Sequence, residues 1–148
     1  MSRLKLLMLL SILTPVILTD ASADEAAWRL LGAVKIEEKG EGLNWEAVKT
    51  FPDDLRAASD AFRITGFAVP IVPEPYVQTF LLVADPEDCP FCGSSGYGPS
   101  LEVHLKRPIA DLTEFDVVTL EDRLELIEDP MTFQAYRLMD AVPMGSQG

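Results

Sequence analysis

The pattern of hydrophobic and polar positions changes near residue 62, where short strand-like runs begin to follow one another between turn residues. Leu101, Val103 and Leu105 alternate with polar residues, so we expect them on the core face of a strand. Glu102 and His104 then share the opposite face. Strands are expected over six segments, namely residues 62–70, 79–84, 101–106, 115–120, 123–128 and 134–142.

Turn residues separate or interrupt these runs. Turns are expected at Glu121-Asp122 and Asp129-Pro130. Gly66 suggests a bulge or sharp bend inside its strand, because glycine weakens regular pairing. Residues 79–84 are apolar on both faces, which favours a central strand that is covered on both sides.

The N-terminal part of the chain mixes short helices with one strand. Residues 26–31 are expected to start as a helix, and residues 33–38 alternate like a strand. Asn44 is a good N-cap, so a brief helix is expected over residues 44–48. One more helical turn is expected over residues 53–58, with Leu55 pointing inward.

These elements predict a mainly β fold. We expect a small OB-like barrel of five to six strands, with one or two short helices near the N-terminus. Residues 24–148 are interpreted as a single domain, since their 125 residues are enough to enclose one hydrophobic core.

Residues 1–23 are typical of a secretory signal peptide. A basic start is followed by an apolar stretch over residues 6–19 and by Ala21-Ser22-Ala23, small residues suited to cleavage before Asp24. The stretch is shorter than the roughly 20 apolar residues that span a bilayer, and Pro15 interrupts it. We therefore expect an exported, periplasmic protein with no membrane insertion after cleavage.

The chain is strongly acidic. It carries 12 basic and 24 acidic residues, which gives a formal net charge of −12 at pH 7. Such a surface repels phosphate backbones and anionic lipid heads, so nucleic acid is not an expected partner. A metal cation, or a periplasmic or membrane protein, is the kind of partner that we expect.

The only two cysteines, Cys89 and Cys92, form the motif Cys-Pro-Phe-Cys. A thiol pair at this spacing can bind a soft metal, cycle between dithiol and disulfide, or lock a turn. Three glycines and a proline within residues 93–99 predict a loop after Cys92. Thioredoxin-type enzymes instead place the reactive thiol at the start of a helix, whose dipole stabilises the thiolate.

Several segments resemble a family of exported bacterial proteins of unknown function. The resemblance lies in Trp28-Arg29-Leu30-Leu31-Gly32, Phe51-Pro52, Ile64-Thr65-Gly66-Phe67, and Cys89-x-x-Cys92-Gly93 leading through Gly98-Pro99 to Glu102-Val103. The resemblance implies an exported OB-like domain in which the paired cysteines are the working site. It implies no particular reaction.

Metal binding is the first hypothesis for the cysteine segment. Cys89 and Cys92 could grip one ion, and thiolates suit zinc or cuprous copper. Zinc is preferred because the sequence has no methionine-rich copper cluster. Four ligands are needed for a structural zinc, and His104 and Glu102 are the nearest suitable groups on the following strand.

Two alternatives stay open. The first is thiol–disulfide exchange by Cys89 and Cys92. The second is a docking module with a structural disulfide, whose binding loop would include Phe91, Gly93, Tyr97 and Pro99. The sequence contains no Gly-x-Ser-x-Gly motif and no phosphate loop, so we expect a binding or accessory protein more than an enzyme.

Overall fold

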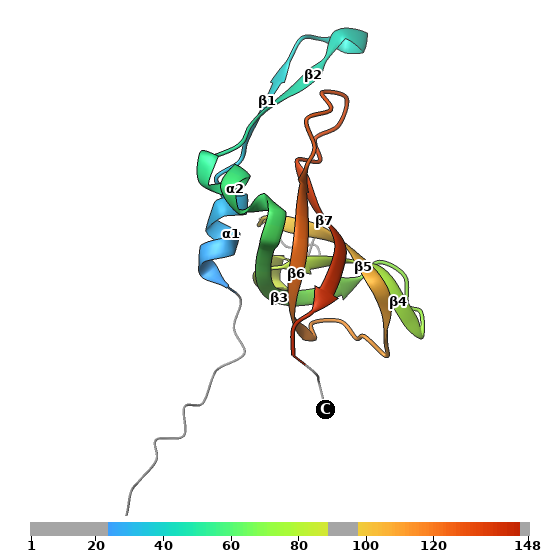
Figure 1. Cartoon of the computed structure of the whole chain (residues 1–148). Helices are drawn as coiled ribbons and strands as arrows, with labels where there is room; N and C mark the ends of the chain where they lie inside the picture. The colour runs from blue at the N-terminus through green and yellow to red at the C-terminus, as the bar shows by residue number, and fades with distance from the viewer. Residues whose placement is uncertain (1–23, 89–97, 146–148) are drawn as a thin grey trace, which may run out of the picture.

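A closed five-stranded barrel forms the body of the molecule (Figure 1). The structure is a computed structural model and describes residues 24–88 and 98–145. The barrel strands are β3 (Phe62–Pro70), β4 (Tyr76–Val83), β5 (Ser100–Ala110), β6 (Val117–Leu126) and β7 (Tyr136–Pro143).

The barrel strands follow the spatial order β3-β4-β5-β7-β6, and β6 pairs with β3 to close the ring. Every neighbouring pair is antiparallel except β5 and β7, which run parallel. This is the arrangement of a small OB-like barrel. The predicted fold class is therefore confirmed.

Alternation along the strands fills the barrel interior. On β5, Leu101 and Val103 are 0% exposed and Leu105 is 3% exposed, as their spacing predicts. Phe80 and Leu82 of β4 are also completely buried in the same cluster. The main hydrophobic cluster runs through the barrel and also includes Trp28, Leu31 and Leu55 from the segments that precede it. Val69 and Val83 form a second, smaller cluster.

One long strand, β6, replaces two predicted strands. The expected turn at Glu121-Asp122 is wrong, because the strand continues from Val117 to Leu126. Residues 117–122 pair with β3 and residues 120–126 pair with β7, where the register shifts between Glu121 and Arg123. A bulge bends a strand without ending it, so the polar pair Glu121-Asp122 marks an irregularity in the pairing with β7 and not a turn.

Glycine 66 is not the site of a bulge. The pairing of β3 with β6 runs without interruption through Gly66 and Val118, so the predicted bulge is absent. The absence of a side chain at Gly66 serves close packing instead, because the neighbouring atoms leave no room for a Cβ.

Two short helices and a hairpin precede the barrel (Figure 1). Helix α1 (Glu25–Gly32) begins at Asp24, whose carboxylate accepts hydrogen bonds from two backbone amides of the first turn. Helix α2 (Asp53–Ala58) buries Leu55 completely, as predicted. Within the described residues, 24–88 and 98–145, no helix is both long and apolar enough to cross a membrane.

The hairpin is formed by β1 (Lys35–Lys39) and β2 (Glu46–Thr50), which pair antiparallel. The helix predicted over residues 44–48 is therefore wrong. Gly40 and Gly42 adopt positive φ angles of 81° and 60°, which suits the chain reversal between the two strands. Residues 42–44 form only a short 3-10 turn, after which the chain pairs back onto β1.

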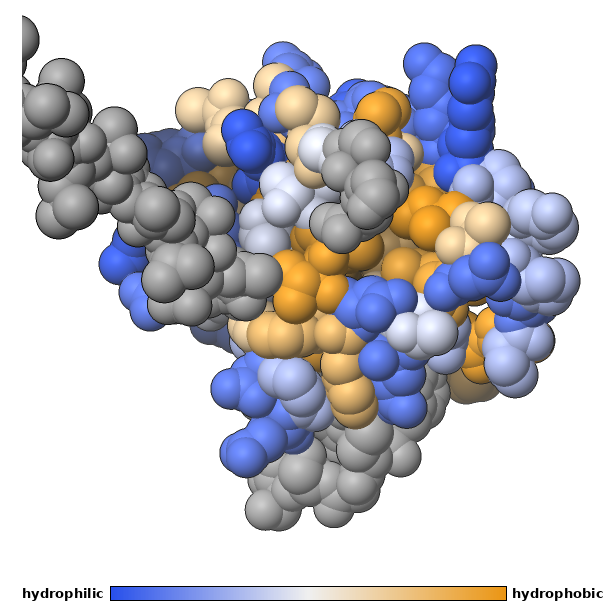
Figure 2. Space-filling model, turned by 90° about the horizontal axis from the view of Figure 1, so that it is seen from below, coloured by the Kyte–Doolittle hydropathy of each residue, from blue (hydrophilic) through white to orange (hydrophobic). Residues whose placement is uncertain are grey.

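The two ends of the barrel carry different structures. The helices and the hairpin lie on one side, and the loop 111–116 and the end of β7 lie below (Figure 1). Figure 2 views the molecule from below and shows hydrophobic residues gathered in the middle of this face, bordered by hydrophilic ones.

Candidate functional site

The predicted cysteine site lies between β4 and β5 along the chain. Val83 at the end of β4 pairs with Ser100 at the start of β5, so the connecting segment leaves and rejoins the barrel at neighbouring positions. A 3-10 turn, η3 (Pro86–Asp88), begins this segment. The predicted residues that fall within 89–97, outside the described residues, are Cys89, Phe91, Cys92, Gly93 and Tyr97.

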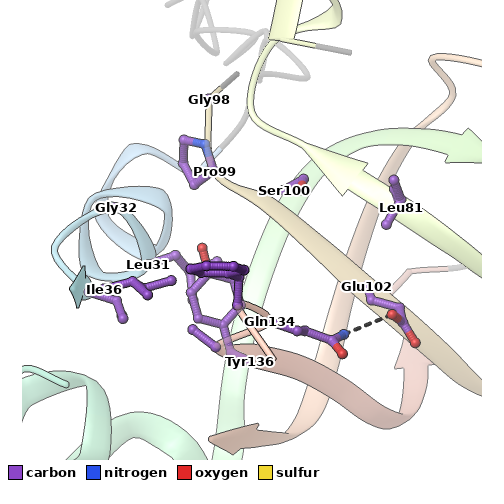
Figure 3. Close-up of a pocket in the computed structure, with 13 residues that line it drawn as sticks. Leu31, Gly32, Ile36, Leu81, Gly98, Pro99, Ser100, Glu102, Gln134 and Tyr136 are labelled. Atoms are coloured by element: carbon purple, nitrogen blue, oxygen red, sulfur yellow. Dashed lines mark hydrogen bonds between the residues drawn. The ribbon is translucent and has the colours of Figure 1, made fainter. Parts of the chain in front are cut away.

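A groove of about 550 Å³ opens where this segment rejoins the barrel (Figure 3). Its lining comes from α1 and the residues that follow it, from β4 and β5, and from residues 133–136. The apolar lining side chains are Leu31, Val34, Ile36, Leu81, Pro99, Phe133, Ala135 and Tyr136. Pro99, which was predicted as part of a binding loop, thus lies in the wall of this groove.

Tyr136 gives the groove a neutral phenol. Burial raises the pKa of Tyr136 to about 12, because the charged phenolate would lose its hydration. The side chain therefore stays uncharged at physiological pH. It adds apolar surface and a hydroxyl to the groove, and no charge.

The outer wall of the groove is fastened to the hairpin. Trp45 stacks on Phe133 with ring centroids 5.1 Å apart. The amino group of Lys49 donates hydrogen bonds to the carbonyl oxygens of Ile127 and Asp129, at 3.0 and 2.7 Å. Burial lowers the pKa of Lys49, and the nearby Asp129 partly opposes this effect. These contacts hold the loop 127–135 against β2.

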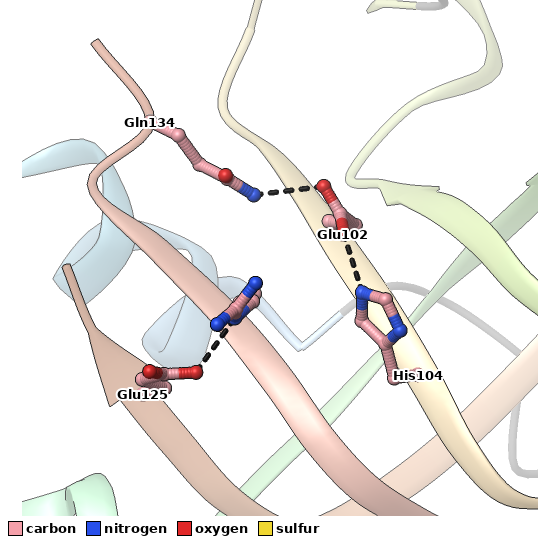
Figure 4. A network of polar contacts seen from close by, with 5 residues as sticks. Glu102, His104, Glu125 and Gln134 are labelled. Atoms are coloured by element: carbon pink, nitrogen blue, oxygen red, sulfur yellow. Dashed lines mark hydrogen bonds and ion pairs between the residues drawn. The ribbon is translucent and has the colours of Figure 1, made fainter. Parts of the chain in front are cut away.

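Glu102 and Gln134 form the polar side of the groove (Figure 3). The side-chain amide of Gln134 donates a hydrogen bond of 2.8 Å to Oε2 of Glu102. The other carboxylate oxygen, Oε1, contacts Nε2 of His104 (Figure 4). Glu102 and His104 therefore share one face of β5 and touch, as the alternation predicts.

The Glu102–His104 pair is partly open to solvent. The side chain of His104 is 33% exposed and that of Glu102 is 30% exposed. Both carboxylate oxygens of Glu102 already contact other side chains, those of Gln134 and His104. Glu102 is therefore better suited to orient these two side chains than to bind a metal ion itself. The histidine ring keeps one nitrogen, Nδ1, that is not used by this contact.

A charged row continues from Glu102 across the barrel surface (Figure 4). Arg137 of β7 is the direct partner of Glu102 on β5 and of Glu125 on β6. The Nε of Arg137 donates a hydrogen bond of 2.6 Å to Glu125. This bond lowers the pKa of Glu125, with smaller contributions from Arg123 and His104, and it raises the pKa of Arg137.

Three members of this network were not predicted as site residues: Gln134, Arg137 and Glu125. Arg137 and Glu125 occupy outward positions of expected strands, which is the only signal that the sequence offers. Their proximity to Glu102 depends on the parallel pairing of β5 with β7. Hydrophobic periodicity does not reveal which strands become neighbours in a barrel.

Two of the predicted metal ligands, His104 and Glu102, lie among the described residues. Among residues 24–88 and 98–145, no group of three or more His, Cys, Asp or Glu side chains is placed to hold a metal ion. His104 and Glu102 alone would give too few ligands for a zinc site. Any such site would have to draw on Cys89 and Cys92, which lie outside the described residues.

Comparison of the chain with protein-family models, with curated proteins and with solved structures found no match. Function is therefore inferred from the side chains of this chain alone.

Proposed function

We propose that the chain is an exported, non-enzymatic binding domain that holds one zinc ion through Cys89, Cys92 and His104. The contact between His104 and Glu102 carries this proposal. A carboxylate only accepts hydrogen bonds, so in the neutral ring Nε2 bears the proton and Nδ1 keeps its lone pair. Metal-binding histidines are commonly held by a carboxylate in this way, which fixes their tautomer and orientation.

The length of the connecting segment is compatible with this ligand set. Ser100 follows Cys92 by eight positions, and an extended chain reaches up to roughly 3.3–3.6 Å per residue. His104 lies four positions beyond Ser100 on β5, a distance of about 13 Å along a strand. The thiols therefore have enough chain to reach the imidazole.

Ligand chemistry favours zinc in this proposal. Thiolate and imidazole ligands together are typical of zinc sites with two or more cysteines. Water or another side chain would complete the coordination. Export to the periplasm is part of the proposal and is supported by the signal-like residues 1–23.

Thiol–disulfide exchange is the weaker alternative. A thioredoxin-type arrangement would continue from Cys92 into a helix. Among the described residues that follow, Gly98 and Pro99 are not helical and Ser100 already begins β5. The carboxylate of Glu102, close to where the segment rejoins the barrel, would also disfavour a thiolate unless a cation balanced it.

Docking of a partner in the groove is a second candidate function. The groove combines an apolar lining with the fixed amide and carboxylate of Gln134 and Glu102, a combination common in ligand sites. Its position beside Pro99 would bring a docked partner next to the cysteine segment. Zinc binding and docking would share Glu102, which contacts His104 through one carboxylate oxygen and Gln134 of the groove through the other.

Zinc titration of the reduced protein tests the main proposal. We expect about one zinc per chain, with both thiols protected from a thiol-reactive probe. His104→Ala should weaken zinc binding at least tenfold. The control, Lys106→Ala, removes an exposed side chain two positions further along the same strand and should bind zinc normally. Zinc that protects neither thiol would rule the proposal out.

A further inference from the structure

A second groove, of about 530 Å³, lies between the loops 71–75 and 111–116 and shares no lining residue with the first groove. Hydrogen bonds fix these loops to each other and to the barrel. The amide of Asp111 donates to the carbonyl oxygen of Pro75 at 3.1 Å, and the amide of Phe115 donates to that of Ala68 at 2.7 Å. The groove is therefore preformed.

Apolar side chains are exposed beside this groove. Ile71, Val72 and Tyr76 are 49%, 55% and 65% exposed, although all three are large and hydrophobic. Leu112, in the lining, is 9% exposed. Ile71 and Val72 belong to the loop 71–75 that walls the groove, and Tyr76 follows this loop directly. The loop thus presents apolar surface to solvent, as interaction sites often do.

Prolines stiffen one wall. Pro70, Pro73 and Pro75 all line the groove. Because proline fixes φ, this loop has little backbone freedom to lose when a partner binds.

The charge of this groove has one sign. Its charged lining residues are Glu74, Asp111 and Glu114. Residues 64–105 and 108–122 contain no lysine or arginine, so the nearest basic residues along the chain are Lys106 and Arg107 on β5. Among the described residues no three acidic side chains are close enough to share a metal ion. Spaced carboxylates of this kind suit several separate positive charges better than a single cation.

The geometry points to a docking site for a basic, amphipathic segment of a partner protein. An apolar side chain of the segment would lie over Leu112 between the two loops. Lysine or arginine side chains of the segment would face Glu74 and Asp111. A second copy of this chain would bring the same negative charges together, and an anionic membrane would be repelled.

Calorimetric titration of the whole protein with a synthetic peptide of alternating leucine and lysine tests this inference. We expect saturable binding to the wild-type chain that weakens as salt is added. The double variant Glu74→Gln/Asp111→Asn should weaken binding at least fivefold, because it removes two charges from the groove. Asparagine tolerates the positive φ of 53° at Asp111, so the variant should fold.

The matched control is Glu37→Gln/Glu38→Gln, which removes two charges from the exposed strand β1. It should bind the peptide within twofold of wild type. Equal losses in both double variants would overturn the inference, because attraction would then come from net charge alone. A serine–lysine peptide that binds as tightly would overturn it too, as would self-association through Ile71 and Val72 or binding to anionic vesicles.

Discussion

Gly66 lies directly against the indole ring of Trp28. A methyl group at Gly66 would come within 2.8 Å of Cζ2 of Trp28 and 2.7 Å of the carbonyl oxygen of Val83. Trp28 itself is 5% exposed, and its Nε1 donates a hydrogen bond of 2.8 Å to the carbonyl oxygen of Thr65. Helix α1 can close this part of the barrel only because β3 has no side chain at position 66.

Gly66→Ala should therefore destabilise the protein by about 1–3 kcal/mol, the usual cost of overpacking a core. Chemical denaturation measures this change. Gly32→Ala is the matched control, since its nearest contact would be Cγ of Pro99 at 3.9 Å. The free energy of unfolding of this control should stay within about 1 kcal/mol of the wild-type value. Equal destabilisation by both variants would contradict the close packing of Trp28 on β3.

The Arg137–Glu125 ion pair should give a pH-dependent contribution to stability. The pKa of Glu125 is lowered in the folded protein, chiefly by its hydrogen bond to Arg137. Its contribution is therefore complete above the ordinary glutamate pKa of about 4.3, and it is lost as the pH falls through the lower folded value.

Arg137→Gln should reduce the free energy of unfolding by about 0.5–1 kcal/mol at neutral pH, since the pair is partly exposed to solvent. The difference from wild type should vanish in strong acid. Urea denaturation across a pH series measures this difference in the free energy of unfolding. The control is Arg63→Gln, which changes an exposed arginine. A loss that is the same at all pH values would show that the ion pair is not its cause.

Tyr136 should make the protein less stable as the pH rises, whereas the Glu125 contribution is lost as the pH falls. Its pKa is raised to about 12 in the folded protein by burial, so above the ordinary tyrosine value the unfolded chain loses its proton first. Stability should therefore decline between about pH 10 and pH 12. Tyr136→Phe should remove this part of the decline in stability. It should also remove the step at highest pH from the absorbance titration of tyrosinate. An unchanged titration in the variant would disprove the burial effect.

Lys49 should control the attachment of the hairpin. Its amino group bonds two carbonyl oxygens of the loop 127–135, and the amide of Ala47 donates to Pro130 at 2.8 Å. Lys49→Ala should speed amide hydrogen exchange in β1 and β2 while exchange in the barrel strands stays close to wild type. Lys35→Ala, an exposed change on the neighbouring strand, should leave both rates unchanged.

The barrel strands were predictable where alternation was regular. Leu101, Val103 and Leu105 identified the core face of β5 and, with it, the shared outer face of Glu102 and His104. The hairpin was not predicted because asparagine is common both in turns and at helix N-caps, so Asn44 fits either structure. The pairing of β2 with β1 selects the turn.

Long-range pairing explains what else the sequence could not supply. The parallel contact of β5 with β7 brings Arg137 and Gln134 to Glu102 across more than thirty residues of chain. The continuity of β6 likewise depends on two different neighbours, because residues 117–122 pair with β3 and residues 120–126 pair with β7. Neither relationship leaves a local pattern in the residues themselves.

X-ray absorption at the zinc edge of the loaded protein tests the central claim most directly. If His104 is held by Glu102 as a metal ligand, the spectrum should fit two sulfur atoms at about 2.3 Å and an imidazole nitrogen at about 2.0–2.1 Å. His104→Ala should lose the imidazole contribution and keep the sulfur atoms. A zinc environment of oxygen atoms without sulfur, or an imidazole signal unchanged by His104→Ala, would contradict the account.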